Sequence, residues 1–313
     1  MTTLLDVARK AGVSKSTVSN VVRGVEFVSS ETRVRVELAI AATGYRPNEI
    51  ARALRGRSTT AIGIVLPDLR NPFHAEMTVA AERAANRLGY ALLAANTECD
   101  PELEEETGRA LIARRVDGVI IGGISLGSHL PKLLLDHGIP VTLASLGDHK
   151  DPRLSIVDTD DRGGMDVIVR HLFDLGHRKM AFVSQSLQEH AGERRRLAFS
   201  QSLLQLGLRP ARSRQGATAI VAHNDMHAIA VMDELERQGI RVPADLSIVG
   251  FDDIPLAAHR RIGLTTIRSD AAAIGGRAVE LIVKAAQSGN LQSTREVFAT
   301  SLVVRSSTGR VMV

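Results

Sequence analysis

From residue 61 onward, short apolar segments alternate with longer segments of helical periodicity, and this alternation limits the possible folds more than any other feature. The predicted strands, each with about five apolar residues, cover 61–67, 90–96, 118–122, 140–144, 154–158, 179–184, 218–223 and 246–251. The predicted helices end at Leu88 or cover 101–114, 130–137, 161–175, 192–206, 225–238 and 271–288. Buried strands that alternate with helices are typical of parallel, doubly wound sheets. Two successive sets predict an α/β region with two lobes and a cleft at the carboxyl ends of the strands.

The first 57 residues have a different pattern, that of short helices joined by tight turns. Ala8 is small enough to let two helices approach closely, Gly12 can take the positive φ of a turn, and Val18 seats the second helix on the first. Ser14 is a predicted N-cap of this second helix. The exposed face of the helix then carries polar side chains, namely Lys15, Ser16, Thr17 and Asn20. Such a face is what a helix needs to read the major groove of DNA.

A third helix and a very short fourth helix follow. Ser29 or Ser30 is expected to cap the third helix, and Gly44 to end it. The fourth helix, over 49–55, has about two turns and is too short to be stable alone in water. We therefore expect it to form only when it packs against a partner copy and DNA.

Charge is unevenly distributed along the chain. Residues 1–60 hold ten Lys or Arg against five Asp or Glu, which gives +5, whereas the other 29 basic and 30 acidic residues give −1. A basic end on a nearly neutral body indicates contact with phosphates at that end.

Three motifs identify a family. Residues 6–19 read D-V-A-x-x-A-G-V-S-x-x-T-V-S, and Tyr-Arg-Pro-Asn at 45–48 and Ala-Arg-Ala-Leu at 51–54 follow. In these motifs the chain resembles the LacI/GalR family of bacterial transcription regulators. Further along, similarity to the family's periplasmic-binding-protein-like effector domain lies in the segments 71–73, 116–118 and 175–178.

The resemblance implies a domain organisation. It predicts an all-α helix-turn-helix headpiece over 1–46, a hinge helix and linker over 47–60, and an α/β domain over 61–313 that binds an effector and dimerises. This last domain is expected to have two doubly wound, parallel-sheet lobes.

The resemblance also implies which headpiece residues contact DNA. Lys15, Ser16 and Asn20 match the positions that read base edges, where Lys15 can donate to guanine and Asn20 can pair with adenine. Thr17 and Ser19 are expected to hold phosphates, which positions the helix without specifying a sequence.

The hinge helix has its own expected contacts. By resemblance, Leu54 wedges between base pairs in the minor groove and kinks the duplex. Arg52 and Arg55 would contact the DNA backbone nearby. The competing interpretation of Leu54, as a simple packing residue, is weaker because so short a linker has little core.

Residues near the ends of predicted strands form a candidate effector site: Phe73, His74, Asp158, Arg195, Asn224 and Asp252. All but His74 and Asp158 match positions that contact the effector in the family. An Arg fork and a carboxylate can bind hydroxyls or a carboxyl group, and an aromatic ring can stack on a sugar or base. Competing interpretations place Phe73 in the core, Arg195 on a solvated face within the run 194–196, and Asn224 or Asp225 as a helix cap.

One connection is shorter than the resemblance requires. The family carries another strand and helix between the helix that ends near Gly207 and the strand at Ala219, but here only LRPARSRQGAT (208–218) is available. A strand, a helix and their turns need roughly twice that length. Either the second lobe lacks one βα unit or the sequence omits a stretch; a genuine loss would remove one wall of the effector cleft.

Two other function classes, a serine hydrolase and a solute-binding protein, compete with DNA binding. Gly123–Gly127 fits G-x-S-x-G, the nucleophile-elbow pattern, and would suggest a serine hydrolase that uses Ser125 with Asp252 and His259. No oxyanion-type glycine cluster precedes this easily met pattern, so we expect no enzyme activity. A solute-binding protein of the same lobed fold is expected to be secreted and to lack the basic headpiece.

Composition also bears on the kinds of site the chain can hold and on its cellular location. Cys99 is the only cysteine, which excludes an intramolecular disulfide and a cysteine-based metal cluster. No apolar run reaches about 18 residues, and no signal-peptide pattern is present, so we expect a cytoplasmic protein without a membrane partner. We predict a sequence-specific DNA-binding transcriptional regulator that acts as a repressor. It would bind a near-palindromic double-stranded operator as a homodimer or dimer of dimers, respond to a small-molecule effector, and use no cofactor or metal.

Overall fold

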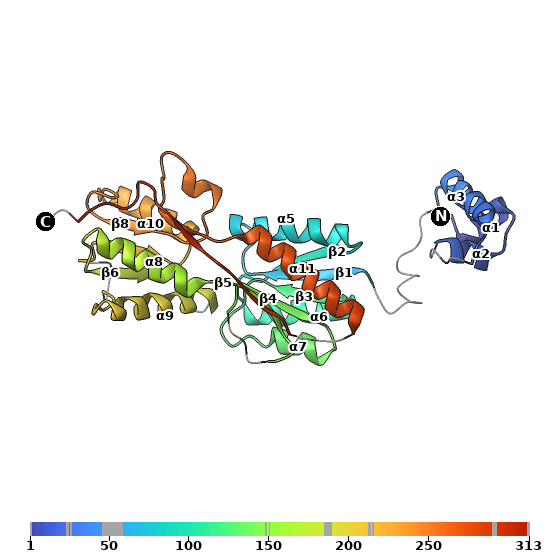
Figure 1. Ribbon diagram of the computed structural model, residues 1–313, viewed down its shortest axis with the longest axis horizontal. Helices are drawn as coiled ribbons and strands as arrows, with labels where there is room; N and C mark the ends of the chain where they lie inside the picture. Colours follow the sequence, from blue (N-terminus) through green and yellow to red (C-terminus); the bar gives the residue numbers. More distant parts are fainter. Residues whose placement is uncertain are drawn as a thin grey trace. The chain divides into compact units, whose positions relative to one another are not determined.

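The structure, a computed structural model, describes residues 2–22, 25, 27–45, 59–147, 149, 151–184, 190–211, 214, 216–289 and 293–311. It divides into two compact units, Met1–Thr59 and Thr60–Val313. They are called the headpiece and the two-lobed domain below (Figure 1).

Three helices of the headpiece are described: α1 (Leu4–Ala11), α2 (Lys15–Val22) and α3 (Ser30–Thr43). Their shared core contains Val7, Ala8, Ala11, Val18, Val21, Val36 and Ala39. Gly12 ends α1 with a φ of 66°, and Gly44 ends α3 with a φ of 62°, so both predicted turns use the left-handed region. Ser29, not Ser30, caps α3, because its hydroxyl accepts the N–H of Thr32.

Lobe 1 of the two-lobed domain is built on a six-stranded sheet in the order β10-β5-β4-β3-β1-β2, with parallel neighbours. The strands are β1 (Ala61–Leu66), β2 (Ala91–Asn96), β3 (Gly118–Ile121), β4 (Val141–Ala144), β5 (Ser155–Thr159) and β10 (Arg295–Phe298). Its helices are α5 (Pro72–Arg87), α6 (Pro101–Ala113), α7 (Leu130–Asp136) and α11 (Ala271–Ser288). The strands β1 and β3–β5 are buried almost throughout, as their continuous apolar runs predict.

Lobe 2 contains a three-stranded parallel sheet in the order β6-β7-β8. Its elements are α8 (Asp161–Asp174), β6 (Met180–Val183), α9 (His190–Gln205), β7 (Ala219–Ala222), α10 (Asp225–Arg237), β8 (Ser247–Val249) and the 3-10 helix η1 (Pro255–Ala258). Residues of β7 alternate between two cores, one shared with α8 and α9 and the other with α10. The two groups of helices therefore cover opposite faces of this sheet (Figure 1).

Three short strands near the carboxyl end were not predicted. They are β9 (Thr266–Arg268), β10, and β11 (Ser301–Val303), which pairs antiparallel with β9. Each has only three or four residues, and β10 alternates exposed and half-buried positions, so no apolar run marks it. The chain passes between the lobes after β5, between β9 and α11, and between β10 and β11.

The described residues of the short connection 208–218 contact the outer strand β6 and the helix α10. The N–H of Ala211 donates to the carbonyl of Met180 at 2.8 Å, and the guanidinium of Arg214 binds Glu234 of α10 at 2.9 Å. Ala211 thus lies beside β6 and Arg214 beside α10. Beside it lies a hollow of about 550 Å³, lined in part by Phe182, Val183 and residues of α10. Among the described residues of lobe 2, no strand pairs with the outer edge of β6. This agrees with either alternative for the short connection, a lost βα unit or an omitted stretch.

Among the helices of the described ranges, none has the combination of length and apolar character needed to span a membrane.

Candidate functional site

The second headpiece helix, α2, begins in a small network of hydroxyl groups. Ser14 Oγ accepts the N–H of Thr17 at 3.1 Å, so Ser14 acts as the predicted cap. The same oxygen lies 2.7 Å from Ser16 Oγ and 2.8 Å from Thr17 Oγ1. These contacts orient the first turn of α2, which carries Lys15 and Ser16, two of the three predicted base-reading residues.

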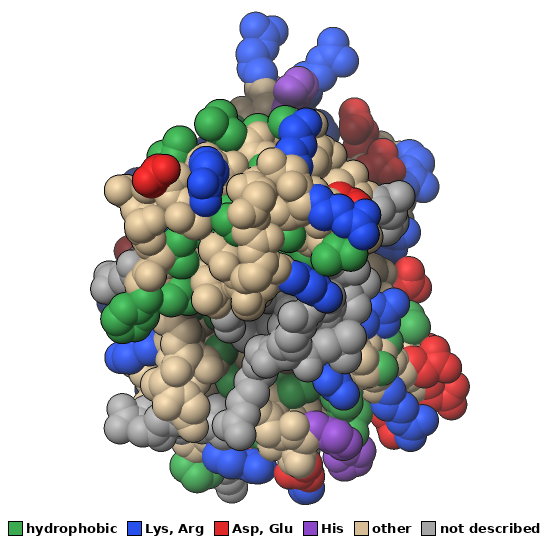
Figure 2. All heavy atoms as spheres, turned by 90° about the vertical axis from the view of Figure 1, so that its right-hand side faces the viewer, with side chains coloured by type: hydrophobic (Ala, Val, Ile, Leu, Met, Phe, Trp, Pro, Cys, Tyr) green, Lys and Arg blue, Asp and Glu red, His purple; other side chains and the backbone are tan. Residues whose placement is uncertain are grey.

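The two faces of α2 differ as predicted. Val18 and Val21 are buried in the headpiece core, whereas Lys15 and Ser16 are exposed. Thr17, Ser19 and Asn20 are half-buried. Figure 2 turns the right-hand side of Figure 1 toward the viewer and shows Lys and Arg side chains scattered over that side, with hydrophobic and acidic side chains among them. The other predicted DNA contacts, namely Arg52, Leu54 and Arg55, lie outside the described residues.

In lobe 2, Arg195 and Asp252, two of the residues predicted for the effector site, are in contact. Arg195 Nη1 donates to Asp252 Oδ1 at 3.4 Å and to the carbonyl of His223 at 2.7 Å, and Nε donates to Asp161 at 3.1 Å. The guanidinium also lies 3.8 Å from the ring centroid of Phe251. The competing interpretation of Arg195 as part of a solvated face is wrong, because its side chain is only 5% exposed.

Asp158, also predicted for the effector site, binds Arg194 and not the predicted site residue Arg195. Both of its carboxylate oxygens accept from Arg194 Nη1 at 3.0 Å, and it also accepts the N–H of Gly147 and of Thr159. Arg194 and its second partner Asp161 were not singled out from the sequence. The helical spacing of Gly192, Arg195, Ala198 and Phe199 could have indicated that this face of α9 is buried.

The remaining candidates have their own local roles. Phe73 belongs to the hydrophobic core, as its competing interpretation proposed. His74 is buried, its Nδ1 lies 2.9 Å from the carbonyl of Asp68, and burial lowers its pKa. The positive charge of Arg195 lowers that pKa further, although the two residues belong to different lobes. Asn224 caps α10 by accepting the N–H of His227 at 2.8 Å.

Asp225 has an environment that the sequence did not indicate. It is fully buried, accepts the hydroxyl of Thr266 and the N–H of Ile254, and does not cap α10. Burial raises its pKa to about 7, and the two hydrogen bonds oppose that shift. This carboxyl group ties the start of α10 to β9 and to the loop that follows Asp252.

Two histidines of lobe 2, one just after β7 and one in the first turn of α10, are in contact. Nδ1 of His223 lies 3.3 Å from Nδ1 of His227, and the ring centroids are 5.2 Å apart. Burial, then the charges of Arg195 and His227, lower the pKa of His223 to about 3. The His223 ring is therefore neutral at physiological pH.

Ser125 is not placed as the nucleophile of a hydrolase. Its hydroxyl donates to Glu104 Oε2 at 3.0 Å and its N–H donates to Glu104 Oε1 at 2.7 Å. Both residues are buried in lobe 1. Asp252, one of its proposed partners, is instead paired with Arg195, so the arrangement lacks the acid–histidine–serine order that activates a hydroxyl.

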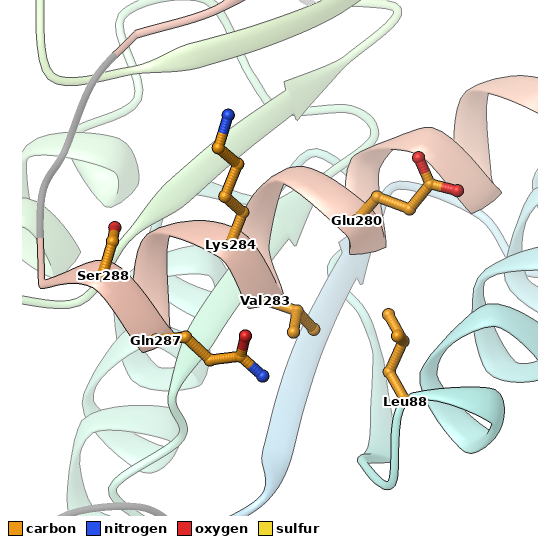
Figure 3. Close-up of a pocket in the computed structure, with 6 residues that line it drawn as sticks. All are labelled: Leu88, Glu280, Val283, Lys284, Gln287 and Ser288. Atoms are coloured by element: carbon orange, nitrogen blue, oxygen red, sulfur yellow. The ribbon is translucent and has the colours of Figure 1, made fainter.

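A separate surface hollow of about 460 Å³ lies between the end of α5 and α11 (Figure 3). In Figure 3 Val283 points toward Leu88, while Glu280, Lys284 and Gln287 project from α11. Leu88 is the C-cap of α5 and is 45% exposed. Val79, within α5, is also 45% exposed. Leu88 is therefore an apolar side chain beside this hollow that a partner surface can bury.

Family models cover both units of the chain. Residues 3–48 match the model of bacterial regulatory proteins of the lacI family, and 59–218 match that of periplasmic binding proteins and the sugar binding domain of the LacI family. Residues 169–308 match a periplasmic binding protein-like domain. The chain belongs to the LacI family.

Relatives from this family align over nearly the whole chain. The HTH-type transcriptional repressor PurR of Aliivibrio salmonicida is 30% identical over 91% of this chain and 92% of its own length. The HTH-type transcriptional regulator DegA of Bacillus subtilis is 32% identical, with 98% of each chain covered. A crystal structure of the lac repressor dimer bound to operator and an anti-inducer has a TM-score of 0.84 and 27% identity, and covers 98% of this chain and 99% of that chain. This LacI-family chain is thus a DNA-binding transcriptional regulator.

The alignment with DegA also bears on the shortened connection. It extends over 332 positions, more than the 313 residues of the chain. The relative therefore has residues at positions where this LacI-family chain has none. A missing strand and helix of lobe 2 is of that size.

Proposed function

We propose that this chain is a sequence-specific transcriptional repressor that binds a near-palindromic operator as a homodimer. In this proposal residues 1–46 read the operator, 47–60 form the hinge, and 61–313 bind the effector and dimerise. Two copies of α2 would enter successive major grooves on one side of the duplex. The exposed apolar side chains Val79 and Leu88 of lobe 1 support burial against a second copy. The chain would act without catalysing a reaction.

One observation carries the DNA-binding part of the proposal. The first turn of α2 presents exposed Lys15 and Ser16 from a helix whose opposite side, at Val18 and Val21, is fixed in the headpiece core. A rigid helix with an exposed cation and hydrogen-bonding groups at its N-terminal end can contact base edges. Each good contact of this kind discriminates against a wrong base by about 1–3 kcal/mol.

The test compares base preference among headpiece variants. Binding of the parent, Lys15→Ala and Asn20→Ala to a randomised duplex pool would be followed by sequencing of the bound DNA. Both substitutions are expected to change which operator positions are selected. Arg35→Ala is the matched control, because Arg35 is an exposed cation on α3 and its loss should alter affinity without altering preference. Unchanged preference in both α2 variants would contradict the proposed reading residues.

For the effector site we propose a small molecule that carries hydroxyl groups. Asp252 supplies acceptor oxygens and Arg195 supplies donors, and the two lie against the ring of Phe251. Phe73, His74, Asp158 and Asn224 remain proposed members of this site, although their side chains also make the contacts described above. Thermal shifts of the parent and of Arg195→Ala against a panel of sugars and nucleobases would test this assignment. A ligand that stabilises both proteins equally would exclude Arg195 as a contact.

A further inference from the structure

Arg194 connects the two lobes through contacts made entirely by groups of this chain. From α9 in lobe 2, its Nη1 reaches both carboxylate oxygens of Asp158 on β5 of lobe 1, at 3.0 Å. Its Nε and Nη2 donate to Asp161, the first residue of α8. One planar guanidinium therefore binds a carboxylate of each lobe, a geometry that suits Arg and that Lys cannot reproduce.

The groups in this contact are shielded from water. The side chain of Arg194 is 21% exposed, that of Asp158 6% and that of Asp161 5%. Ion pairs that are largely buried are screened much less than surface pairs, and breaking one leaves an uncompensated charge. Asp158 is also held from its own lobe, because it accepts the N–H of Gly147 at 3.2 Å and of Thr159 at 2.9 Å.

Gly147 shows how closely the lobes meet here. It has a φ of +77°, and a Cβ atom at this position would lie 1.9 Å from Arg194 Nη1. Only glycine lets the guanidinium lie against the lobe 1 backbone. A second contact between the lobes is made by the first residue of α9, since the N–H of His190 donates to the carbonyl of Ile124 at 3.3 Å.

We propose that Arg194, through its contacts with Asp158 and Asp161, is an internal clasp that holds the two lobes together when no effector is bound. An effector would then act on a lobe arrangement that this clasp already stabilises. An effector shifts an equilibrium only by its differential affinity for the two arrangements. Because Arg194 stabilises one arrangement, it determines how far an effector can shift the equilibrium between the two. This inference rests on the proposed function only where the lobe arrangement is taken to affect operator binding. The lobe arrangement is measured without DNA or effector, so either proposal can fail while the other stands.

The experiment measures a distance between the lobes in the full-length protein. Spin labels would be placed at Leu126→Cys in lobe 1 and Leu204→Cys on α9, both exposed positions, in a Cys99→Ser background. Mixing with excess unlabelled chain isolates the distance within one chain from distances between copies. Dialysed parent protein should give one narrow distance distribution. Arg194→Ala should shift it to longer distances and broaden it, whereas Arg196→Ala should not, because Arg196 pairs with Glu193 within α9.

A second pair of variants perturbs the clasp from lobe 1 and leaves every charge in place. Gly147→Ala should displace Arg194 and broaden the distribution. Gly127→Ala is its control, since Gly127 has the same φ of +77° but no atom within 4 Å of the added Cβ. Circular dichroism would verify folding of each variant. A parent distribution that is already broad overturns the proposal, as does a folded Arg194→Ala or Gly147→Ala that keeps the parental distance.

Discussion

Asp225 offers a test of how burial controls stability in lobe 2. Its carboxylate is fully buried, and its two oxygens accept the Thr266 hydroxyl at 2.5 Å and the Ile254 N–H at 2.9 Å. Burial raises its pKa from the ordinary 3.8 to about 7. Because the folded-state pKa lies above the unfolded value, the folded protein binds the proton more tightly. The contribution of Asp225 to stability is therefore complete below about pH 4 and is lost as the pH rises to about 7.

The size of this effect follows from the pKa values. One pKa unit corresponds to about 1.4 kcal/mol, so the whole shift is worth roughly 4 kcal/mol. Between pH 5 and pH 8, the pH crosses about two units of this range before it passes the pKa near 7. The free energy of unfolding should therefore fall by roughly 3 kcal/mol because of this one group. Asp225→Asn removes the titration, while its amide oxygen can accept from Ile254 and its NH₂ group can donate to Thr266.

Urea unfolding of the parent and of Asp225→Asn at pH 5 and pH 8, followed by circular dichroism, measures the effect. Relative to the parent, the variant should gain roughly 3 kcal/mol in free energy of unfolding between the lower and the higher pH. Asp233→Asn is the control, because Asp233 is an exposed carboxylate on the same helix. If the stability of Asp225→Asn depends on pH in the same way as that of the parent, Asp225 does not titrate as its burial requires.

Three further substitutions test other parts of the molecule. Val18→Ala removes a fully buried side chain and should cost the headpiece about 2 kcal/mol in thermal unfolding while its base preference is kept; a changed preference would mean that Val18 does more than pack. Ser125→Ala should destabilise lobe 1 by about 1–3 kcal/mol in urea, because buried Glu104 loses its hydroxyl partner, and the parent should not react with a fluorophosphonate, whereas labelling at Ser125 would revive the hydrolase. Leu54→Gly should weaken operator binding in a gel-shift titration, and parental affinity would rule out the hinge wedge.

Sequence patterns determined those parts of the protein that depend on local periodicity and on recurring motifs. The eight predicted strands are all present. Most are continuous apolar runs buried in a parallel sheet, whereas β2 is half-buried to exposed along its length. The headpiece turns at Gly12 and Gly44 were predictable because few residues other than glycine adopt their positive φ. The family followed from motifs in the same headpiece, and the short connection after Gly207 followed from counting residues.

Tertiary structure alone decided which charged groups meet. The three successive arginines 194–196 look alike in the sequence, yet their partners differ. Arg194 binds Asp158 and Asp161, Arg195 binds Asp161 and Asp252, and Arg196 stays half-exposed beside Glu193. Asp225 was expected to be at most a helix cap, and its burial against β9 became visible only in the fold. Contacts between residues 30 to 60 positions apart depend on how the lobes and sheets pack, and a local pattern carries no information about that packing.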